Sequence, residues 1–402
     1  MQMQRIAAFH LTWAAFATGA SLALAASVGR AQTRTDSAGV QLVELATLAT
    51  SSIAVRIEER PLLQLGGLRS DPDAEFDSRH ALLRTLLLPD GQVVVNDYTA
   101  LKVFDPQGRL LRTIGRSGSG PGEFQQTRGV CRADGDTLIA FDFALRRASV
   151  FTTDGSFVRT VVTDSRPVPL GSGCFGDGSV VMFANARPNP ASTLPPDRAR
   201  RLDRVADFRR IATARRDVTA LGTWPIDPVS PFIAPLTVQV VDGVIFVGDS
   251  HRREVRQHDG QGRLTRVIRW QSPRTRITPA LIEQVVRART APSTPRSVIE
   301  QQMQAYRASP LPDELPGFLQ MLVDPLQRVW LEEYPITARS DTWTVLSREG
   351  AVLGRVRIPR PPGIGERSLS ELVEVLGDRV ALRWRDEDGA VHLTYHAITV
   401  AP

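Results

Sequence analysis

Short apolar runs joined by tight turns recur along most of the chain. Representative runs read TLLLPDGQVVVND, VCRADGDTLIAFD, VQVVDGVIFVGD, QMLVDPLQRVWLEE and VEVLGDRVALRW. Each run places β-branched and aromatic residues on both sides of a short turn, which is the pattern of a β-hairpin. Six such turns occur, at residues 89–91, 134–135, 177–178, 242–243, 324–327 and 377–378. This pattern predicts a protein built mainly of antiparallel strands.

A second hairpin follows several of the first ones, as in LKVFDPQGRLLRTI, SVFTTDGSFVRTV, VRQHDGQGRLTRVI and WTVLSREGAVLGRV. Each unit then contains four strands and repeats after roughly 43 to 50 residues, which is typical of the blades of a β-propeller. Two units are longer because they carry insertions, at about residues 186–198 and 271–319. Six units predict six blades.

The glycine-rich stretch GRSGSGPGEF, residues 115–124, can be interpreted as a phosphate-binding loop, a linker or a structural joint. The segments LLQLGGLRSDPDAEF (62–76) and LLRTIGRSGSGPGEF (110–124) align without a gap, with Gly67 under Gly115. Neither segment contains GxxxxGK[ST] or leads from a strand into a helix, as a phosphate-binding loop does. A joint that recurs from unit to unit indicates a sharp crossover between blades, where glycine supplies positive φ.

The N-terminal part of the chain matches a fourth strand and a crossover without three strands before it. The last unit, residues 372–400, has three recognisable strands and no fourth. We therefore expect the strand near residues 53–65 to complete the last blade, which removes an open sheet edge. The predicted fold is all-β: a six-bladed β-propeller of four-stranded antiparallel blades, closed by an N-terminal strand, with a helical insertion between blades four and five.

A resemblance to a known family rests on the pattern GxGPGEF, an apolar strand, Asp-Gly and a second apolar strand ending in Asp. Together with VFDPQGRLLRTIG, this pattern resembles the repeats of NHL propellers. The chain looks most similar to secreted bacterial six-bladed β-propeller proteins, in which LPDELPGFLQMLVDPLQRVWLEE also has counterparts. The resemblance spans residues 40–400 in outline and is strongest in the first two units. It implies the fold but no single activity, because propellers host unrelated functions.

Residues 1–31 have the pattern of an export signal. Arg5 precedes a stretch, residues 11–28, that is mostly apolar or small, and small residues lie near Ala31, where a signal peptidase would cleave. We expect cleavage there, which leaves residues 32–402 as one exported propeller domain, periplasmic or extracellular. The alternative is a retained membrane anchor. No later segment has the ~20 consecutive apolar residues of a spanning helix.

The chain has 49 basic and 43 acidic residues, and nearly all of the basic ones are arginines. The arginines are scattered among Asp and Glu, whereas nucleic-acid-binding proteins gather their basic residues into a stripe. This distribution predicts a solvated surface and no nucleic-acid partner. We expect a monomer, and the sequence does not specify which protein or small molecule it binds.

Both insertions fall on the face formed by the crossovers between blades and the loops between the second and third strands. We call this the top face. The first insertion is rich in proline and is expected to be irregular. The second contains two amphipathic helices: Thr278 is predicted to cap one, and Ser297 with Glu300 forms a capping box for the other. The helices form either a plug that adds stability or a lid over a pocket.

Polar residues recur where the second strands are predicted to end on the top face. They are Asp97, Asp142, Asn185, Asp249 and Glu332. A ring of such oxygen ligands would suit Ca²⁺ or another divalent cation. Lactonase-type propellers, which this architecture resembles, bind a metal in that general location, but no motif of theirs matches residue by residue. The alternative is that these side chains cap backbone turns locally.

Two cysteines lie in the same register of adjacent blades, since Cys131 and Cys174 each precede a turn glycine by the same number of residues. In an oxidising compartment the two can form a disulfide, provided that their Cα atoms lie within about 7 Å. The alternative is a pair of free thiols held too far apart. The zinc-site and serine-hydrolase motifs HExxH, paired CxxC and GxSxG do not occur.

These patterns lead to two functional hypotheses. The first is an exported binding or scaffold module, with its ligand or partner on the top face over the central channel. The second is a metal-dependent hydrolase or lyase of the lactonase type, with a divalent cation at the channel mouth. Neither hypothesis assigns a catalytic residue, and no cofactor is certain.

Overall fold

The computed structural model describes residues 32–48, 55–67, 72–76, 84–162, 164–167, 173–215, 217–226, 232, 236–289, 294–308, 311–334, 342–359 and 370–400. The predicted signal peptide lies outside these residues. None of the helices in the described ranges is long and apolar enough to cross a membrane.

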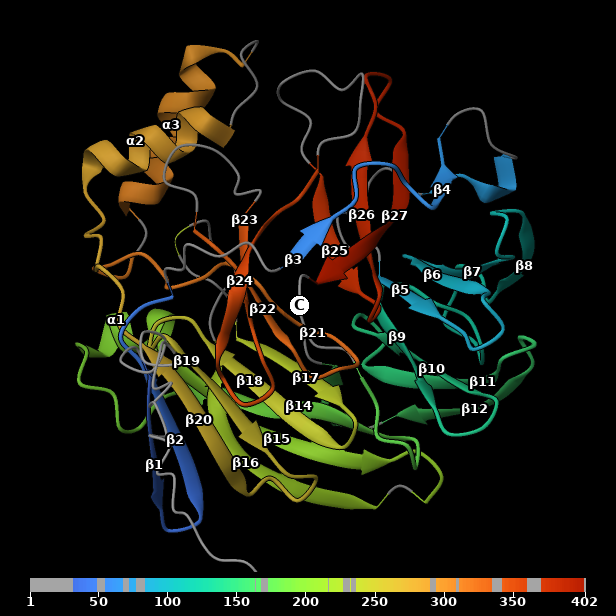
Figure 1. The fold of residues 1–402 in the computed structure, drawn as a ribbon, viewed down its shortest axis with the longest axis horizontal. Coiled ribbons are helices and arrows are strands. Elements are labelled where there is room, and N and C mark those ends of the chain that lie inside the picture. Colours follow the sequence, from blue (N-terminus) through green and yellow to red (C-terminus); the bar gives the residue numbers. More distant parts are fainter. Residues whose placement is uncertain are drawn as a thin grey trace, which may run out of the picture.

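Six small sheets stand side by side around a common centre (Figure 1). Blade 1 consists of β5 (Arg84–Leu87), β6 (Val93–Asp97), β7 (Ala100–Phe104) and β8 (Leu110–Ile114). Blade 2 consists of β9 (Thr127–Ala133), β10 (Thr137–Asp142), β11 (Arg147–Thr152) and β12 (Phe157–Val162). Blade 3 consists of β13 (Arg166–Pro167), β14 (Ser179–Pro188), β15 (Arg204–Ala212) and β16 (Val218–Ile226).

The other three blades follow the same antiparallel order. Blade 4 contains β17 (Thr237–Val241), β18 (Val244–Asp249), β19 (Glu254–His258) and β20 (Leu264–Trp270). Blade 5 contains β21 (Met321–Val323), β22 (Val329–Glu332), β23 (Thr342–Leu346) and β24 (Val352–Arg357). Blade 6 contains β25 (Glu371–Val375), β26 (Arg379–Arg385) and β27 (Val391–Val400). The predicted six-bladed β-propeller is confirmed.

The N-terminal part of the chain completes blade 6, as predicted. Two short strands, β3 (Val55–Ile57) and β4 (Leu63–Gly66), both pair antiparallel with β27. The Gln64 amide also hydrogen-bonds Nδ1 of His392, 328 residues further along the chain. The ring is therefore closed by contacts between the two ends of the propeller sequence.

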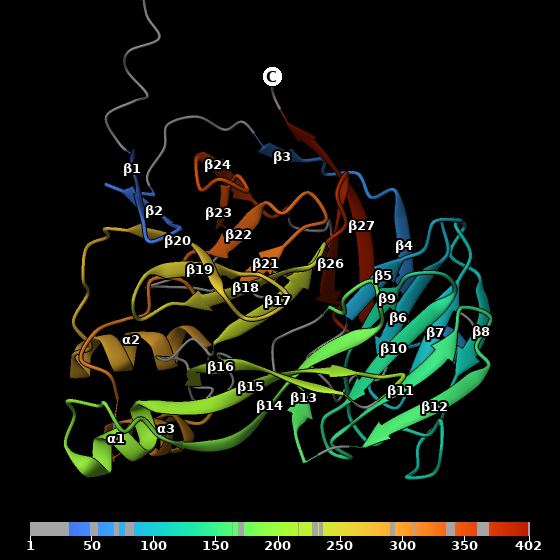
Figure 2. The ribbon, with the colours of Figure 1, turned by 90° about the horizontal axis from the view of Figure 1, so that it is seen from below.

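An N-terminal hairpin that the sequence patterns did not predict enlarges blade 4. Its strands are β1 (Gln32–Ser37) and β2 (Val40–Leu45), and β2 pairs parallel with β20 (Figure 2). Val43 and Leu45 are buried in a cluster with Trp270. Because β3 also contacts β24 of blade 5, β2 and β3 together touch blades 4, 5 and 6. We call β2 and β3 the N-terminal strap.

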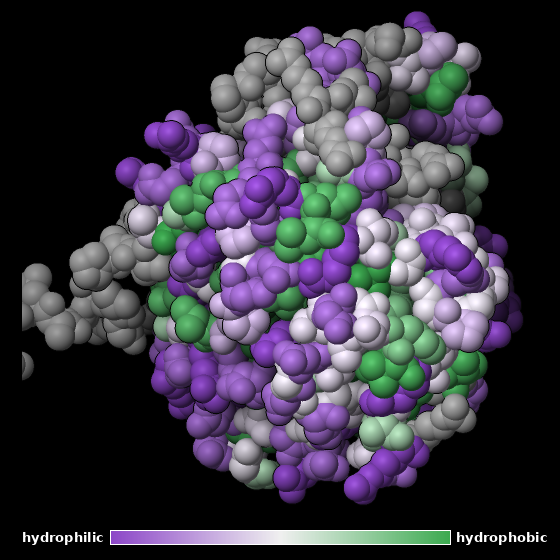
Figure 3. Space-filling view, turned by 90° about the vertical axis from the view of Figure 1, so that its right-hand side faces the viewer, coloured by the Kyte–Doolittle hydropathy of each residue, from purple (hydrophilic) through white to green (hydrophobic). Residues whose placement is uncertain are grey.

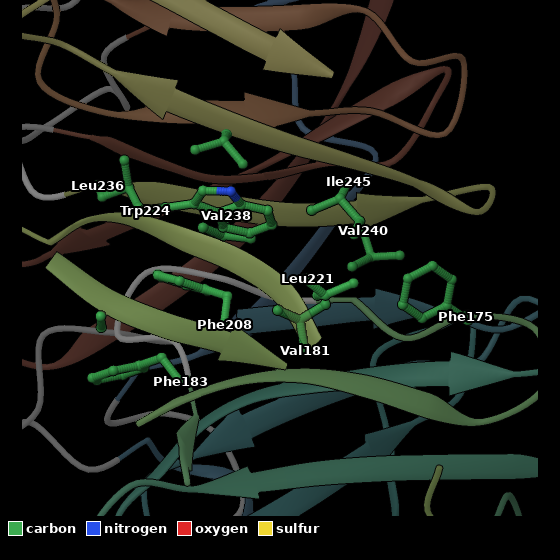
Figure 4. Close-up of a cluster of buried hydrophobic side chains, with 12 residues drawn as sticks. Phe175, Val181, Phe183, Phe208, Leu221, Trp224, Leu236, Val238, Val240 and Ile245 are labelled. Carbon is green, nitrogen blue, oxygen red and sulfur yellow. The ribbon is translucent and has the colours of Figure 1, made fainter. Parts of the chain in front are cut away.

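The apolar core is divided into layers between neighbouring blades. Val93, Val94 and Val95 are all buried, although their side chains alternate between the two faces of the sheet. Both faces of a blade are therefore covered, which favours continuous apolar runs over strict alternation. Figure 4 shows the layer between blades 3 and 4, where the rings of Phe208 and Trp224 lie 4.7 Å apart beside valines of β17.

The outer strands of blades 1 and 2 expose part of their apolar residues. Figure 3, which shows this side of the molecule, has separate hydrophobic patches surrounded by hydrophilic residues. On β12, Phe157, Val158 and Val162 are 40%, 47% and 61% exposed. Isolated patches of this kind are normal on a soluble protein.

The glycine-rich stretch is a joint between blades, as predicted. Gly115 has a φ of +77°, and a Cβ there would lie 2.4 Å from the Phe124 ring and 2.9 Å from the Gly122 carbonyl oxygen. In the earlier copy of the joint, Gly66 has a φ of +78° and a Cβ would lie 2.7 Å from the Phe76 ring. The structural counterpart of Gly115 is thus Gly66, one residue before the position that the ungapped alignment gives.

Among the described residues, four helical segments lie in the connections. They are η1 (Pro72–Ala74), α1 (Pro196–Leu202), α2 (Pro279–Arg289) and α3 (Arg296–Ala308). The hydroxyl of Thr278 accepts a hydrogen bond from Leu281 N (3.2 Å), which confirms its capping role. The predicted capping box is wrong, because α3 begins before Ser297. Its Glu300 instead forms an ion pair with Arg296 (2.9 Å).

Candidate functional site

Hydrogen bonds tie the blade-to-blade crossovers to the ends of the second strands, which defines the top face. The Asp142 carboxylate at the end of β10 accepts hydrogen bonds from Gln125 N (2.7 Å) and Gln126 N (3.2 Å) of the preceding crossover. Gly317 N, in the crossover between blades 4 and 5, donates to the Ser250 carbonyl oxygen just after β18 (2.9 Å). Both insertions reach this face.

A cavity of about 270 Å³ opens on the top face between the two insertions. Its lining includes Arg198 and Leu202 of α1, Asp249 and His251 after β18, and Pro312 and Asp313 after α3. In Figure 1 the three α-helices lie to one side of the ring rather than over its centre. The cavity is therefore displaced from the central channel over which a ligand was expected.

Helix α1 positions an arginine that joins the two insertions. The insertion was expected to be irregular, but Pro196 occupies the first turn of α1, where its missing N–H costs nothing. Arg198 Nη2 donates to the Leu311 carbonyl oxygen (3.0 Å) and to Asp313 Oδ1 (3.1 Å). Since Asp313 is 78% exposed, this ion pair adds less than about 1 kcal/mol of stability. It links the two insertions at the wall of the cavity.

Helices α2 and α3 pack against each other beside the cavity. Leu281, Ile282 and Val285 of α2 form one buried cluster with Met303 of α3, and Phe232 from the preceding crossover joins them. The predicted apolar faces are thus confirmed. The helical pair has its own small core, and the segment after α3 brings Asp313 to the cavity.

The turn after β18 contributes the ionisable side chains of Asp249 and His251 to the cavity. Burial lowers the pKa of His251; Arg253 lowers it further, whereas the nearby Asp249 carboxylate opposes the shift. The imidazole is therefore neutral at pH 7 and has a nitrogen that can accept a hydrogen bond or a proton. Asp249 itself accepts a hydrogen bond from Arg252 N (3.0 Å) and lies 3.5 Å from the Arg252 guanidinium.

Like Asp249, the other residues of the predicted ligand ring have local partners. Asp97 pairs with Lys102 (3.0 Å), and Asp142 holds the backbone as described above. Asn185, which has a φ of +53°, donates to Asp207 Oδ2 (2.9 Å). Glu332 exchanges backbone hydrogen bonds with the end of the second insertion.

The five side chains do not come together as metal ligands. Within the described ranges, no group of three or more His, Cys, Asp or Glu side chains could hold a metal ion. The ring positions fit the alternative in which strand-end carboxylates and amides fix nearby turns. A Ca²⁺ site at these positions has no support in the described residues.

Blades 2 and 3 are joined covalently near the channel. The structure pairs Cys131 of β9 with Cys174 in a disulfide, and their Cα atoms lie 6.0 Å apart. Cys174 forms a β-bridge with Val180, at the position of the innermost strand of blade 3. The two inner strands are thus close enough for the pairing that the sequence left open.

Sequence analysis missed Arg198, His251 and Asp313 as site residues. The proline-rich insertion and the second insertion were both placed on the correct face. No local motif, however, marks a salt bridge such as Arg198–Asp313, whose partners are 115 residues apart. His251 follows the flagged Asp249 by two positions, and this proximity was the available signal.

No protein-family model matches the chain, and no curated protein sequence matches it. Among solved structures it is similar to a putative exported protein from Bacteroides fragilis, with 12% identity, a TM-score of 0.46 and coverage of 88% of this chain and 98% of that one. A duf4221 family member from Bacteroides vulgatus has 11% identity and a TM-score of 0.48, with 86% and 99% coverage. Virginiamycin B lyase from Staphylococcus aureus has 9% identity and a TM-score of 0.40, with 86% and 98% coverage. Similarity at this level does not carry a function to this chain.

Proposed function

We propose that the protein is an exported binding module, an NHL-like propeller that holds a small polar ligand in the cavity between its two insertions. The observation that carries this proposal is the cavity itself, which both insertions and the turn after β18 line on one face. Insertions that converge on one concavity of a rigid ring are the usual way in which propellers and other scaffolds acquire a site. Export is supported by the N-terminal pattern and by the disulfide.

The charges of the lining favour a ligand that carries both signs. Arg198 and Arg252 provide guanidinium groups, while Asp203, Asp249 and Asp313 provide carboxylates. Leucine and proline side chains form the remaining walls. An amino acid or a short peptide combines an ammonium, a carboxylate and an apolar side chain in a suitable size. We therefore propose this class of ligand.

A thermal-shift screen with free amino acids and dipeptides tests the proposal. A ligand that binds only the folded protein raises its melting temperature. The Arg198→Ala and Asp313→Ala variants should lose this rise, because each removes a charged wall of the cavity. The matched control is Arg296→Ala, which breaks an exposed ion pair on α3 outside the cavity. A shift that persists in both cavity variants, or the absence of any shift in the wild type, would reject the proposed site.

A second candidate function is a hydrolase or lyase, and the state of His251 favours it. A neutral imidazole at the edge of a cavity, next to the carboxylate of Asp249, can act as a general base. The metal-dependent form of this hypothesis has no ligand set among the described residues. Activity against a panel of lactones and esters that survives EDTA and is lost in His251→Gln would support a metal-independent enzyme.

A further inference from the structure

An arginine lies at or next to the first residue of the innermost strand in three consecutive blades. Arg84 is the first residue of β5, Arg128 the second of β9 and Arg166 the first of β13. Because each crossover enters its blade from the top face, these residues lie at the top end of the central channel. Figure 1 shows β5 and β9 next to each other at the centre of the ring, where the two strands are in contact.

Two of these arginines share one aromatic ring. The guanidinium carbons of Arg128 and Arg166 lie 5.5 Å and 5.9 Å from the centroid of Phe143. Arg84 donates to the Val373 carbonyl oxygen (2.6 Å). Within the part of the chain that the structure describes, neither Arg128 nor Arg166 has a carboxylate or carbonyl partner, and Nε of Arg128 is buried without one.

The ring of Phe143 is held in place by a hydrogen-bonded turn. Asp142 accepts hydrogen bonds from Gln125 N and Gln126 N and, through its other oxygen, from Leu145 N (2.8 Å). Phe143 N donates to the Gln126 carbonyl oxygen (2.9 Å). The turn after β10 is therefore rigid, and it fixes the Phe143 ring that both arginines contact.

A buried amide lies at the top end of blade 1, on the side that faces blade 2. Val94 of β6 and Val130 of β9 pack in one cluster, so these sides of blades 1 and 2 face each other. Side chains two residues apart in a strand point to the same side. Asn96 thus extends from the blade-1 surface at its top end, whereas Arg128 lies at a register irregularity of β9, where this alternation does not apply. Asn96 is fully buried, and neither polar atom of its amide has a hydrogen-bond partner within the described residues.

The contacts with Phe143 leave the guanidinium groups of Arg128 and Arg166 without an ion pair among the described residues. A cation–π contact of an exposed arginine contributes about 0.5 to 1 kcal/mol, which does not replace the hydrogen bonds of a guanidinium group taken partly out of water. Two guanidinium groups near one ring also repel each other. An oxyanion between them would accept hydrogen bonds from both and remove the repulsion.

We propose that the top end of the central channel, between blades 1, 2 and 3, binds an oxyanion, a carboxylate or a phosphate group, through Arg128 and Arg166. This site is separate from the cavity between the insertions, because neither arginine lines that cavity. It does not depend on the function proposed for that cavity.

Calorimetric titration at low ionic strength tests the site with two probes, succinate and inorganic phosphate. At least one probe should bind the wild type at a single site, and sodium chloride should weaken the binding. Arg128→Gln and Arg166→Gln should each weaken it by roughly 10- to 100-fold, the range expected for a hydrogen bond to a charged group. The control Arg198→Gln should leave it unchanged. No binding of either probe, or equal weakening by the control, overturns the proposal.

Chemical modification of the wild type gives a second test that does not depend on folded variants. Phenylglyoxal modifies accessible guanidinium groups, and mass spectrometry after digestion reports each site. Succinate or phosphate should protect Arg128 and Arg166 from modification. Arg116, which is 82% exposed on the neighbouring crossover, should remain unprotected. Equal modification of Arg128 and Arg166 with and without both anions would contradict an anion site there.

Discussion

Glu374, on the innermost strand of blade 6, offers a test of the energetics of the ring interior. Burial raises the pKa of Glu374 to about 7, and the neighbouring positive charge of Arg84 only partly opposes this effect. The ionised carboxylate is therefore less stable in the folded protein than in the unfolded chain. We expect Glu374→Gln, which keeps the shape and removes the charge, to stabilise the protein at alkaline pH.

The magnitude follows from the pKa. A tenfold change in proton affinity corresponds to about 1.4 kcal/mol, so a rise from the usual 4.5 to about 7 costs on the order of 3 kcal/mol once the group is ionised in both states. Below the usual value both states are protonated and the cost vanishes. It appears as the pH rises from 4.5 and is complete above about 7. Relative to the wild type, the variant should gain roughly 3 kcal/mol at pH 8 and less than about 1 kcal/mol at pH 5.

Urea denaturation at pH 5 and pH 8 measures this difference. The control is Glu387→Gln, the same chemical change at an exposed position of blade 6, and it should show no comparable dependence on pH. A Glu374→Gln variant that is no more stable than the wild type at pH 8, or equally stabilised at both pH values, would refute the reasoning. In that case the buried charge would have to be balanced by an interaction stronger than that with Arg84.

Four further predictions concern the fold. Thiol titration of the unfolded, non-reduced protein should find no free thiol, and two reactive thiols would disprove the disulfide. Because the disulfide closes a loop of 43 residues, Cys131→Ser should lower the free energy of unfolding by about 4 kcal/mol. Gly115→Ala should cost roughly 2 kcal/mol or more in denaturant unfolding, because alanine is strained at this φ and its Cβ has no space. Deletion of residues 32–48 should lower stability by roughly 2 to 4 kcal/mol while the circular dichroism of the ring is retained, since two buried aliphatic side chains are lost. Because the folded state lowers the pKa of His251, the free energy of unfolding of the wild type should fall as the pH drops below 6.5. In thermal unfolding curves recorded over this pH range, His251→Gln should lose less stability than the wild type.

The architecture was predictable because its signals are local. Short turns between β-branched runs, four of the six containing Asp-Gly, specify the first hairpin of each unit, and the repeat of these hairpins specifies the blades. The amphipathic pattern of residues 279–289 likewise predicted α2 from nearby residues alone. Closure was deduced from a missing fourth strand, so it also depended only on counting local units.

The N-terminal hairpin was not predictable in the same way. Parallel pairing of β2 with β20 requires no turn between them, and no residue of QLVEL indicates which sheet will receive it. Helix α1 was missed because its prolines were taken as breakers, whereas proline is tolerated in the first turn of a helix. The start of α3 was misplaced by a capping-box pattern that lies inside the helix.

The residues of the candidate cavity were predictable from the sequence only where their position depends on local signals. The sequence placed Asp249 and both insertions on the top face, since strand ends and loop positions follow from the repeat. It did not show that Arg198 would reach Asp313, because that contact depends on how two long insertions fold. The ring of polar residues remains a prediction as a ligand set, and Asp97, Asp142 and Asn185 each have a partner close to their own strand end.

The N-terminal closure of blade 6 has a consequence for how the protein folds. Five blades can form from neighbouring segments, but β3 and β4 have no partner until β27, more than 300 residues later, is in place. Contacts between such distant segments form slowly, since their loop-closure entropy must be overcome first. We therefore expect joining of the chain ends to limit the refolding rate. Until then the outer edge of β27, which is already paired with β26 on its other side, has no partner strand, and two such intermediates would associate there.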